Sequence, residues 1–181
     1  KVAIEKAKNI EGMNVLHIGI GGGSLQLSLY DKELDKVVGT SSIAVGSKTL
    51  QEAIKDFGKN IILPSTQKII ADEVDNFKAY YDFRDYKDNL AVLINSGSAT
   101  RVMSKLSGAE KYEPIKFAGE NMAVEDMISE NEKLSEMSFD EVVSNGYSGK
   151  DVAETTATGA YVTKEVLKAL DLNEGQEVQI S

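Results

Sequence analysis

Residues 14–45 alternate short apolar stretches with glycines, and this pattern constrains the fold more than any other part of the sequence. The stretches are NVLHIGI, LQLSLYD and DKVVGTSSIAV, at residues 14–20, 25–31 and 35–45. Leu25, Leu27 and Leu29 alternate with other residues, as expected for a strand with one buried face. The link at residues 30–35 is short and charged, as in a hairpin. These features predict three strands, with a turn of glycines between the first two.

Helical patterns begin after the third strand. The spacing of Thr49 and Glu52 fits a capping box, which predicts the start of a first helix, and Gly58 predicts its end. The apolar face of this helix is expected at Leu50, Ala53, Ile54 and Phe57. Pro64 is expected to start a longer helix. The buried stripe of that second helix is expected at Ile70, Val74, Phe77 and Tyr81.

The second half of the chain has the pattern of an α/β fold. Residues 90–94 are an apolar run of strand length, followed by small residues and a helix-like stretch to Leu106. The pattern is helical from Glu120 onward. A second capping box is expected at Ser138 and Glu141, and Ser148 with Asp151 is expected to cap the last long helix. The final EVQIS predicts a short strand. Without a linker, repeat or low-complexity tract, residues 1–181 are expected to form a single domain.

Composition narrows the function classes. The 181 residues include 20 Lys and Arg against 29 Asp and Glu, a net charge of -9. This argues against a general nucleic-acid binder, because phosphate contacts need clustered basic side chains. Tyr80, Tyr81 and Tyr86 leave a base-stacking surface open as an alternative to ordinary packing. The absence of Cys excludes disulfide scaffolds, thiolate zinc sites and cysteine nucleophiles.

The ends and the apolar runs of the chain bear on its location. No apolar run is long enough to span a membrane. The chain begins at Lys1 and its first Met is Met13, so no signal peptide is visible. We therefore expect a piece of a longer protein that has no membrane partner.

The sharpest local signal is the run Gly21, Gly22, Gly23 and Ser24 between two predicted strands. Residues without Cβ let backbone N–H groups approach a ligand and allow positive φ, the geometry of an anion-binding nest. A tight hairpin that needs glycine only for its turn is the alternative. The run is neither a P-loop nor a dinucleotide fingerprint, because Gly-Lys-Ser/Thr is missing and a strand follows. A second turn at Gly97 and Ser98 favours phosphate binding, because it precedes a predicted helix.

Four blocks of the sequence resemble, in order and spacing, the second domain of the exopolyphosphatase and guanosine pentaphosphatase (Ppx/GppA) phosphatase family. They are GIGGGSLQLSLYD, SSIAVGSKTLQEAI, INSGSATRVMSKL and ATGAYVTKEVLKAL, and they cover nearly the whole chain. The resemblance implies an actin-like ATPase (ribonuclease H-like) α/β domain with a mixed five-stranded sheet flanked by helices. This domain would be the C-terminal lobe of a two-lobed protein, and the N-terminal lobe would precede Lys1.

The resemblance also implies a function. Proteins of this family are cytoplasmic, bacterial hydrolases that use Mg²⁺ to remove the terminal phosphate of polyphosphate or pppGpp in a cleft between the two lobes. A homodimer is compatible with the resemblance, and no nucleic-acid partner is expected, because the chain is acidic. The general-base Glu of the family lies upstream of this domain, and no segment between Lys1 and Met13 matches it.

When the functional residues of the family are matched one by one to this sequence, those of the two turns are preserved. The family's phosphate loop matches Gly21, Gly22, Gly23 and Ser24, whose backbone N–H groups are expected to bind phosphate. The second turn matches Gly97, Ser98, Ala99 and Thr100.

The charged positions of the family are altered. Gly19 stands at the family Asp position, or His17 does if one residue is inserted, and Gln26 stands at the family Glu position. Thr49 represents the family Arg, with Lys48 as a candidate substitute that lacks the bidentate geometry of Arg. His17 is either a base that titrates near neutral pH or a hydrogen-bonded structural residue.

These substitutions lead to two function hypotheses. Mg²⁺ is usually anchored by one or two carboxylates, so metal binding is expected to be weak. Loss of an electrostatic stabiliser costs on the order of 100-fold to 1000-fold in rate, so the chain alone is expected not to turn over substrate. The first hypothesis is a domain of a Ppx/GppA-like phosphohydrolase. The second is a non-catalytic member that binds a phosphorylated ligand or has a regulatory role.

Overall fold

Three antiparallel strands form where the sequence predicts them. They are β1 (Asn14–Ile20), β2 (Leu25–Asp31) and β3 (Lys36–Ile43). Leu25, Leu27 and Leu29 are all buried, so their period-2 pattern marks the core side of β2. These elements are taken from a computed structural model, which describes residues 13–109, 112 and 114–181.

The mixed sheet has six strands, one more than expected. Their order is β3-β2-β1-β4-β6-β5, in which β4 (Leu90–Ser96) is parallel to β1 and β6 (Glu177–Ile180) is parallel to β4. The additional strand, β5 (Asn121–Ala123), pairs antiparallel with β6. It lies where the sequence pattern predicts helix, because three residues are too few to show a strand period before the next helix begins.

The first helix, α2 (Ser47–Phe57), starts earlier than predicted. Gly46 is its N-cap, and Thr49 lies in the first turn, where its Oγ1 accepts a hydrogen bond from the Gly46 N–H at 2.9 Å. Thr49 is therefore not the N-cap of a capping box with Glu52. Leu50 is buried as expected, but Phe57 is 64% exposed and does not belong to the buried face.

The second helix, α3 (Lys59–Tyr80), also starts upstream of its predicted first residue, Pro64. Proline removes one helical N–H, and the carbonyl left without that donor belongs to exposed Asn60, where water can satisfy it. The predicted stripe is confirmed at buried Ile70, Val74 and Phe77.

The tyrosines near the end of α3 are engaged in packing and hydrogen bonds. The Tyr81 ring covers Gly39, where a Cβ would come within 2.8 Å of it. The Tyr86 hydroxyl donates to the Asp31 carboxylate at 3.1 Å, whereas Tyr80 is exposed. Two of the three rings are therefore held by the fold, which argues against a shared stacking surface.

Four further helices complete the described part of the chain. They are α4 (Gly97–Leu106), α5 (Val124–Glu136), α6 (Phe139–Ser144) and α7 (Ala153–Leu170). The capping box at Ser138 and Glu141 is confirmed at the start of α6. The predicted cap of α7 is wrong, because the 3-10 turn η4 (Lys150–Val152) intervenes and Val152 takes the N-cap position.

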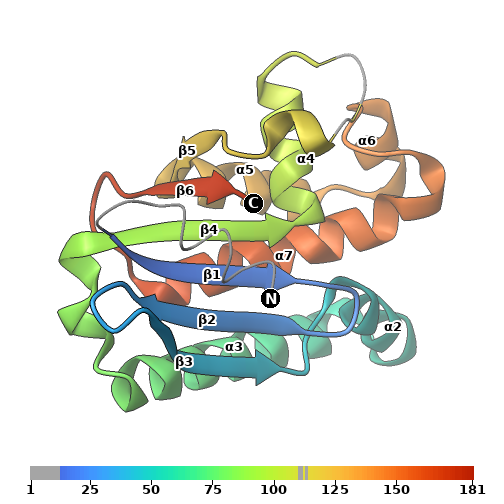
Figure 1. Cartoon of the computed structure of the whole chain (residues 1–181). Helices are drawn as coiled ribbons and strands as arrows, with labels where there is room; N and C mark the ends of the chain where they lie inside the picture. Colours follow the sequence, from blue (N-terminus) through green and yellow to red (C-terminus); the bar gives the residue numbers. More distant parts are fainter. Residues whose placement is uncertain (1–12, 110–111, 113) are drawn as a thin grey trace.

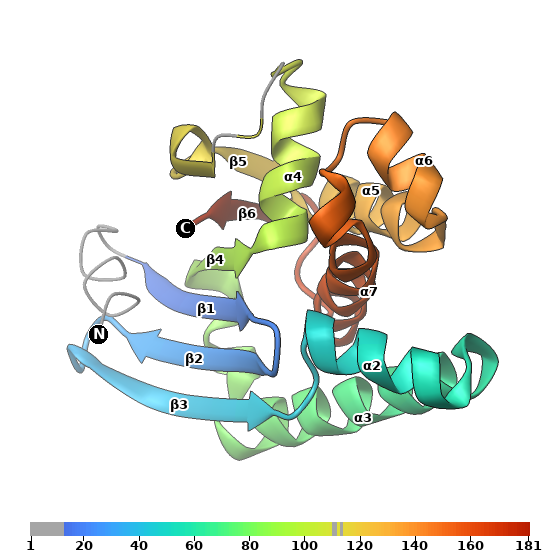
Figure 2. The ribbon, with the colours of Figure 1, turned by 90° about the vertical axis from the view of Figure 1, so that its right-hand side faces the viewer.

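The helices pack on one face of the sheet (Figures 1 and 2). α7 crosses the middle of this layer and contacts α2, α3, α4 and α5. Leu16 and Ile18 of β1 point into this core, while Val15 belongs to a small cluster on the opposite face. Within the described residues, no helix has the length and apolar character needed to cross a membrane.

Candidate functional site

The carboxyl ends of β1 and β4 lie side by side at one edge of the sheet. The two strands are parallel, and their register pairs Ile20 with Ser96. The glycine loop after β1 and the Gly97 turn after β4 are therefore neighbours. The N-termini of α2, α4 and α7 also meet at this edge (Figure 1). Ligands of open α/β sheets commonly bind at such an edge, outside the carboxyl ends of parallel strands.

The glycine loop (residues 21–24) is a tight turn whose carbonyl groups bind the start of α2. The Gly21 N–H donates to the Ser24 carbonyl at 2.9 Å and closes the turn. The Gly21 carbonyl accepts from the Ser47 N–H at 3.0 Å, and the Gly22 carbonyl accepts from the next two amides of α2 at 2.9 and 3.0 Å. The first amides of α2 are thus satisfied by the loop and are not left for a ligand.

The conformation of this loop differs from the expected nest. Neither Gly21, Gly22 nor Gly23 has a positive φ. Close packing requires glycine at position 46, where a Cβ would lie 2.5 Å from backbone atoms of Gly22 and Gly23, whereas a Cβ at Gly23 itself would meet no atom within 4 Å. The N–H groups of Gly22, Gly23 and Ser24 donate no hydrogen bond to any described residue, and the glycines are exposed. These amides have no partner among the described residues, and their binding of phosphate stays a prediction.

A buried triangle of hydroxyl groups supports the start of α4. The side-chain oxygens of Ser96, Ser98 and Thr163 lie 2.9 Å from one another. Ser96 is the N-cap, and its Oγ accepts from the Ala99 N–H at 3.4 Å. The Ser98 hydroxyl is therefore turned into the core, so this residue can offer a ligand only its backbone N–H.

A pocket of about 150 Å³ opens at this edge, and we call it the edge pocket. Its lining comes from β1, α2, β4, α4, η4 and α7: Ile20, Ser47, Ser96, Gly97, Ser98, Arg101, Val152, Thr155, Thr156 and Gly159. Gly159 lets α7 cross the start of α2, because a Cβ there would be 3.4 Å from the Ser47 Cβ. The lining is thus mostly small and polar, with Arg101 as its basic side chain.

Sequence reasoning did not single out Arg101. Its Nη1 donates to the Tyr147 carbonyl at 3.1 Å, and its Cζ lies 4.0 Å from the centroid of the Tyr112 ring. Burial lowers the pKa of the Arg101 guanidinium below its usual value, while Tyr112 and Asp151 act in the opposite direction. An Arg stays charged in proteins, so Arg101 places a full positive charge at the edge pocket. The sequence did contain a signal for this position: Arg101 lies four residues after Gly97, and residues at that spacing share one face of a helix.

Gly19 and Gln26 face each other across β1 and β2, on the side of the sheet away from the helices. The register pairs them directly, and a Cβ at Gly19 would lie 3.8 Å from the Gln26 Cβ. The same Cβ would lie 3.5 Å from His17 Cε1, and His17 Nε2 lies 3.5 Å from the Ser181 hydroxyl. The structure therefore groups the three positions at which the family resemblance leads one to expect a metal-associated carboxylate.

The residues at these positions do not fit a magnesium site. Gln26 offers a neutral amide oxygen, Gly19 has no side chain and His17 offers nitrogen, whereas Mg²⁺ prefers carboxylate and water oxygens. In the part of the chain that the structure describes, no group of three or more His, Cys, Asp or Glu side chains could hold a metal ion.

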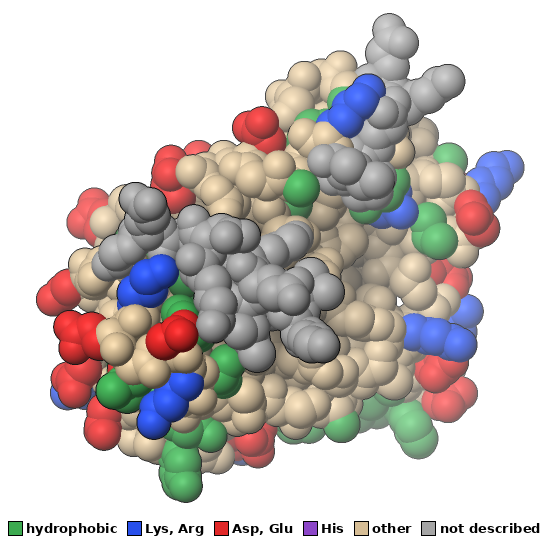
Figure 3. Space-filling view, viewed as in Figure 1, with side chains coloured by type: hydrophobic (Ala, Val, Ile, Leu, Met, Phe, Trp, Pro, Cys, Tyr) green, Lys and Arg blue, Asp and Glu red, His purple; other side chains and the backbone are tan. Residues whose placement is uncertain are grey.

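Charge is distributed unevenly over the face seen in Figure 3. Acidic side chains are most numerous at the left-hand end of this view, and some also lie at its right-hand side, where the strands end at the glycine loop. Lys48 lies in the first turn of α2, beside the loop, but its side chain is 70% exposed and its Nζ lies 3.9 Å from the Glu52 carboxylate. Two larger concavities, of about 550 and 540 Å³, surround the end of α3, and neither is lined by residues of the two glycine turns.

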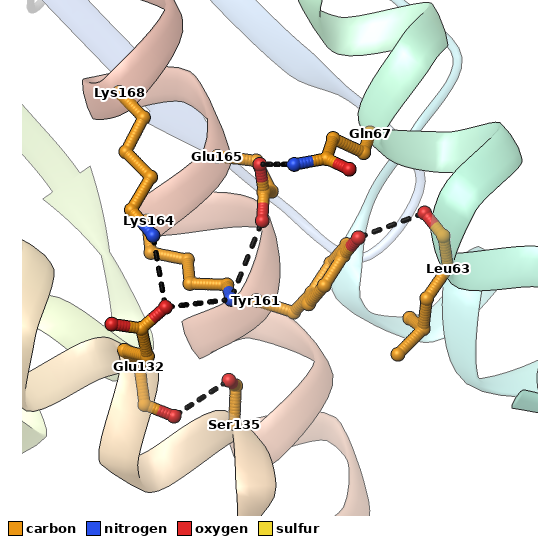
Figure 4. Close-up of polar contacts among 8 residues, drawn as sticks. All are labelled: Leu63, Gln67, Glu132, Ser135, Tyr161, Lys164, Glu165 and Lys168. Carbon is orange, nitrogen blue, oxygen red and sulfur yellow. Dashed lines mark hydrogen bonds and ion pairs between the residues drawn. The ribbon is translucent and has the colours of Figure 1, made fainter. Parts of the chain in front are cut away.

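The C-terminal part of α7, beyond the edge pocket, is held by a polar network that joins it to α3 and α5 (Figure 4). Lys164 lies 3.3 Å from Glu132 and 3.4 Å from Glu165, whose carboxylate also accepts from Gln67 at 3.1 Å. The Tyr161 hydroxyl donates to the Leu63 carbonyl at 2.8 Å. These contacts hold the helix that carries Thr155, Thr156 and Gly159 into the edge pocket.

The meander β1–β2–β3, continued by parallel β4 and β6 under a helical layer, defines an α/β domain of the actin-like, ribonuclease H-like class. Solved Ppx/GppA structures share this fold. The chain superposes on the Aquifex aeolicus member of the Ppx/GppA family with a TM-score of 0.75 and 15% identity, covering 99% of this chain and 55% of that one.

Two further solved structures agree. The type II variant of the Aquifex aeolicus Ppx/GppA phosphatase gives a TM-score of 0.71 at 15% identity, over 93% of this chain and 53% of that chain. An exopolyphosphatase from Cytophaga hutchinsonii gives 0.66 at 15% identity, over 98% and 56%. The chain thus spans little more than half the length of these proteins. No protein-family model and no curated protein matches it.

Proposed function

We propose that this chain is the C-terminal lobe of a cytoplasmic, bacterial phosphohydrolase of the Ppx/GppA type. In this proposal its edge binds the terminal phosphates of polyphosphate or pppGpp, and an N-terminal lobe completes the cleft. The likeness in fold to Ppx/GppA structures supports it, as does the coverage of about half of those chains.

The observation that carries the proposal is the meeting of two glycine turns at one edge. The amides of Gly22, Gly23 and Ser24 have no partner among the described residues, and Gly97 begins α4 beside them. Unpaired backbone amides at two neighbouring turns suit the oxygens of a phosphate group, because they donate hydrogen bonds without a side-chain charge.

Turnover by this chain alone is not expected. Hydrolysis of a phosphoanhydride needs an oriented water and neutralisation of the charge on the transferring group. Gly19 and Gln26 supply neither a base nor a carboxylate for a metal. We therefore assign phosphate binding to this lobe, and water activation to residues outside it.

A second candidate function is phosphate-ligand binding without catalysis, in a sensing or regulatory member of the same type. The facing pair of Gly19 and Gln26 favours it, because the amide cradle is present where the expected carboxylates are replaced. The two candidates predict the same ligand and differ only in turnover by the two-lobed protein.

The binding test is an NMR titration of the isotope-labelled chain with inorganic tripolyphosphate. Saturable shifts are expected in the amide signals of Gly22, Gly23, Ser24 and Gly97, with Gly175 as a remote glycine control. Shifts that are absent, or equally large at Gly175, would contradict phosphate binding at this edge.

The turnover test measures phosphate release from polyphosphate and pppGpp, with and without Mg²⁺. The chain alone is expected to release none. Mg²⁺-dependent release by the two-lobed protein supports the phosphohydrolase, and binding without release supports the second candidate. A Gln26→Glu variant that gains activity points to a catalytic site that has lost its carboxylate.

A further inference from the structure

We propose that Arg101, rather than a carboxylate-held divalent cation, supplies the positive charge that meets the terminal phosphate at the edge pocket. This inference rests on the proposed phosphate-binding function and concerns the same edge. It identifies a binding residue that the family resemblance does not mark.

Backbone amides alone supply too little positive charge to balance a phosphate bound at the edge pocket. The N-terminus of a helix is equivalent to about half an elementary charge. The whole chain carries -9, so a polyanionic ligand is repelled at long range. A phosphate therefore needs a cation at the point of contact, from either a side chain or a metal.

The other sources of charge at this edge are poorly suited. Gly19, Gln26 and His17 form no carboxylate group for Mg²⁺. Lys48 is largely exposed, and it forms an ion pair with Glu52 on its own helix. An exposed ammonium beside a carboxylate adds little attraction, because water screens it and the carboxylate offsets it.

Arg101 differs in position and surroundings. It lies four residues after Gly97 on α4, so it shares a helix face with the turn, and it lines the edge pocket. The Tyr147 carbonyl and the Tyr112 ring orient its guanidinium plane. Among the described residues no carboxylate forms an ion pair with Arg101, although Asp151 is near enough to raise its pKa, and the guanidinium donates one hydrogen bond, to the Tyr147 carbonyl. A guanidinium has five N–H donors, so it can bind a phosphate while keeping this contact.

The edge pocket, of about 150 Å³, is much smaller than the concavities of about 550 and 540 Å³ near the end of α3. We assign it a single terminal phosphoryl group, held by the fork of Arg101 and the amides at the start of α4.

The test is calorimetric titration of inorganic tripolyphosphate into the chain in EDTA, at fixed ionic strength. Arg101→Gln is expected to weaken binding by about tenfold to a hundredfold, since charge-assisted hydrogen bonds are the stronger ones. Lys105→Gln is the matched control, because it removes one positive charge from an exposed position on the same helix. It is expected to change the affinity by less than about twofold.

Two further variants address folding and geometry. Arg101→Lys keeps the charge but loses the planar fork, and an intermediate affinity is expected. If Arg101→Gln does not fold, the Nε signal of Arg101 in the unmodified chain must shift on addition of tripolyphosphate; an unchanged signal overturns the proposal.

Metal dependence is tested separately by titrating Mg²⁺ alone. The unmodified chain is expected to show no saturable binding at millimolar Mg²⁺, whereas Gly19→Asp combined with Gln26→Glu is expected to bind it. Tripolyphosphate binding that requires Mg²⁺, or that survives Arg101→Gln unchanged, refutes the role of Arg101 but leaves the proposed function. No binding with or without Mg²⁺ refutes the proposed function itself.

Discussion

Gly46→Ala is expected to separate the glycine loop from α2. The backbone of Gly46, with φ -132° and ψ 173°, is open to alanine, so the substitution causes no backbone strain. The new Cβ would, however, lie 2.5 Å from backbone atoms of Gly22 and Gly23. Relief of this contact must move the loop, which breaks the three hydrogen bonds that its carbonyls accept from α2.

The size of the effect follows from those bonds. At about 1 kcal/mol net for each, their loss lowers the free energy of unfolding by about 2–3 kcal/mol. With an m-value of about 2 kcal/mol/M, the urea midpoint falls by about 1–1.5 M. Far-UV circular dichroism is the suitable probe, because the chain has no Trp. Tripolyphosphate binding is expected to weaken as well, because the loop amides lose their orientation.

Gly23→Ala is the matched control for this prediction. A Cβ at Gly23 meets no atom within 4 Å, and its φ is not positive. Its expected effect on stability is neutral, or a gain of a few tenths of a kcal/mol from a less flexible unfolded chain. If Gly46→Ala unfolds at the same urea concentration as the unmodified chain, or if Gly23→Ala is equally damaging, the packing argument for Gly46 is wrong.

Three other substitutions test contacts around α7. Thr163→Val keeps the side-chain shape but removes one hydroxyl of the buried triangle. The free energy of unfolding measured in urea is expected to fall by about 1–3 kcal/mol, and Thr163→Ser should recover most of that loss. Burial of Tyr161, and to a smaller extent the charge of Glu165, raises the pKa of its hydroxyl from 10.0 to about 12. The contribution of this group to the free energy of unfolding is therefore complete below pH 10 and is lost as the pH rises to about 12. Tyr161→Phe should flatten that alkaline decline in melting temperature, and ultraviolet titration should lose one of two tyrosinate steps near pH 12, the other belonging to Tyr30. An unaltered profile contradicts the assignment. Lys164→Met leaves the buried Glu165 carboxylate without its cation and should cost about 3–5 kcal/mol, against less than about 0.5 for the exposed control Lys68→Met.

The part of the fold that sequence predicts well is the part with strong periodicity. Leu25, Leu27 and Leu29 identify β2 and its buried face, because an alternation of period two fits a half-buried strand and fits a helix poorly. Boundaries predicted from single residues are less accurate. Pro64 predicts the start of α3, yet the helix begins five residues earlier, at Lys59, because the exposed position of Pro64 lets the helix continue through it.

The site shows a similar division. The order of residues identifies the two glycine turns, and the parallel register of β1 and β4 shows that they are neighbours. Their conformation is not predictable, because the constraint on Gly46 comes from a loop that is remote in sequence. Arg101 is not predictable from the sequence for the same reason. A basic residue on a helix usually belongs to a solvated face, and only the tertiary packing places this one at the edge pocket. The sequence likewise marks Gly19 and Gln26 as two altered positions, and only the strand register shows that they face each other.

The edge pocket takes its lining from segments around Ile20, Ser47, Gly97 and Thr155, which are spread over most of the chain. No single helix or hairpin can form it, so the pocket exists only when all of these segments are docked together. Occupancy is therefore linked to global unfolding, and ligand at 100 times its dissociation constant would stabilise the native state by about 2.7 kcal/mol. Amide hydrogen exchange should then slow across the central strands as a whole, and not only at the residues in contact with phosphate.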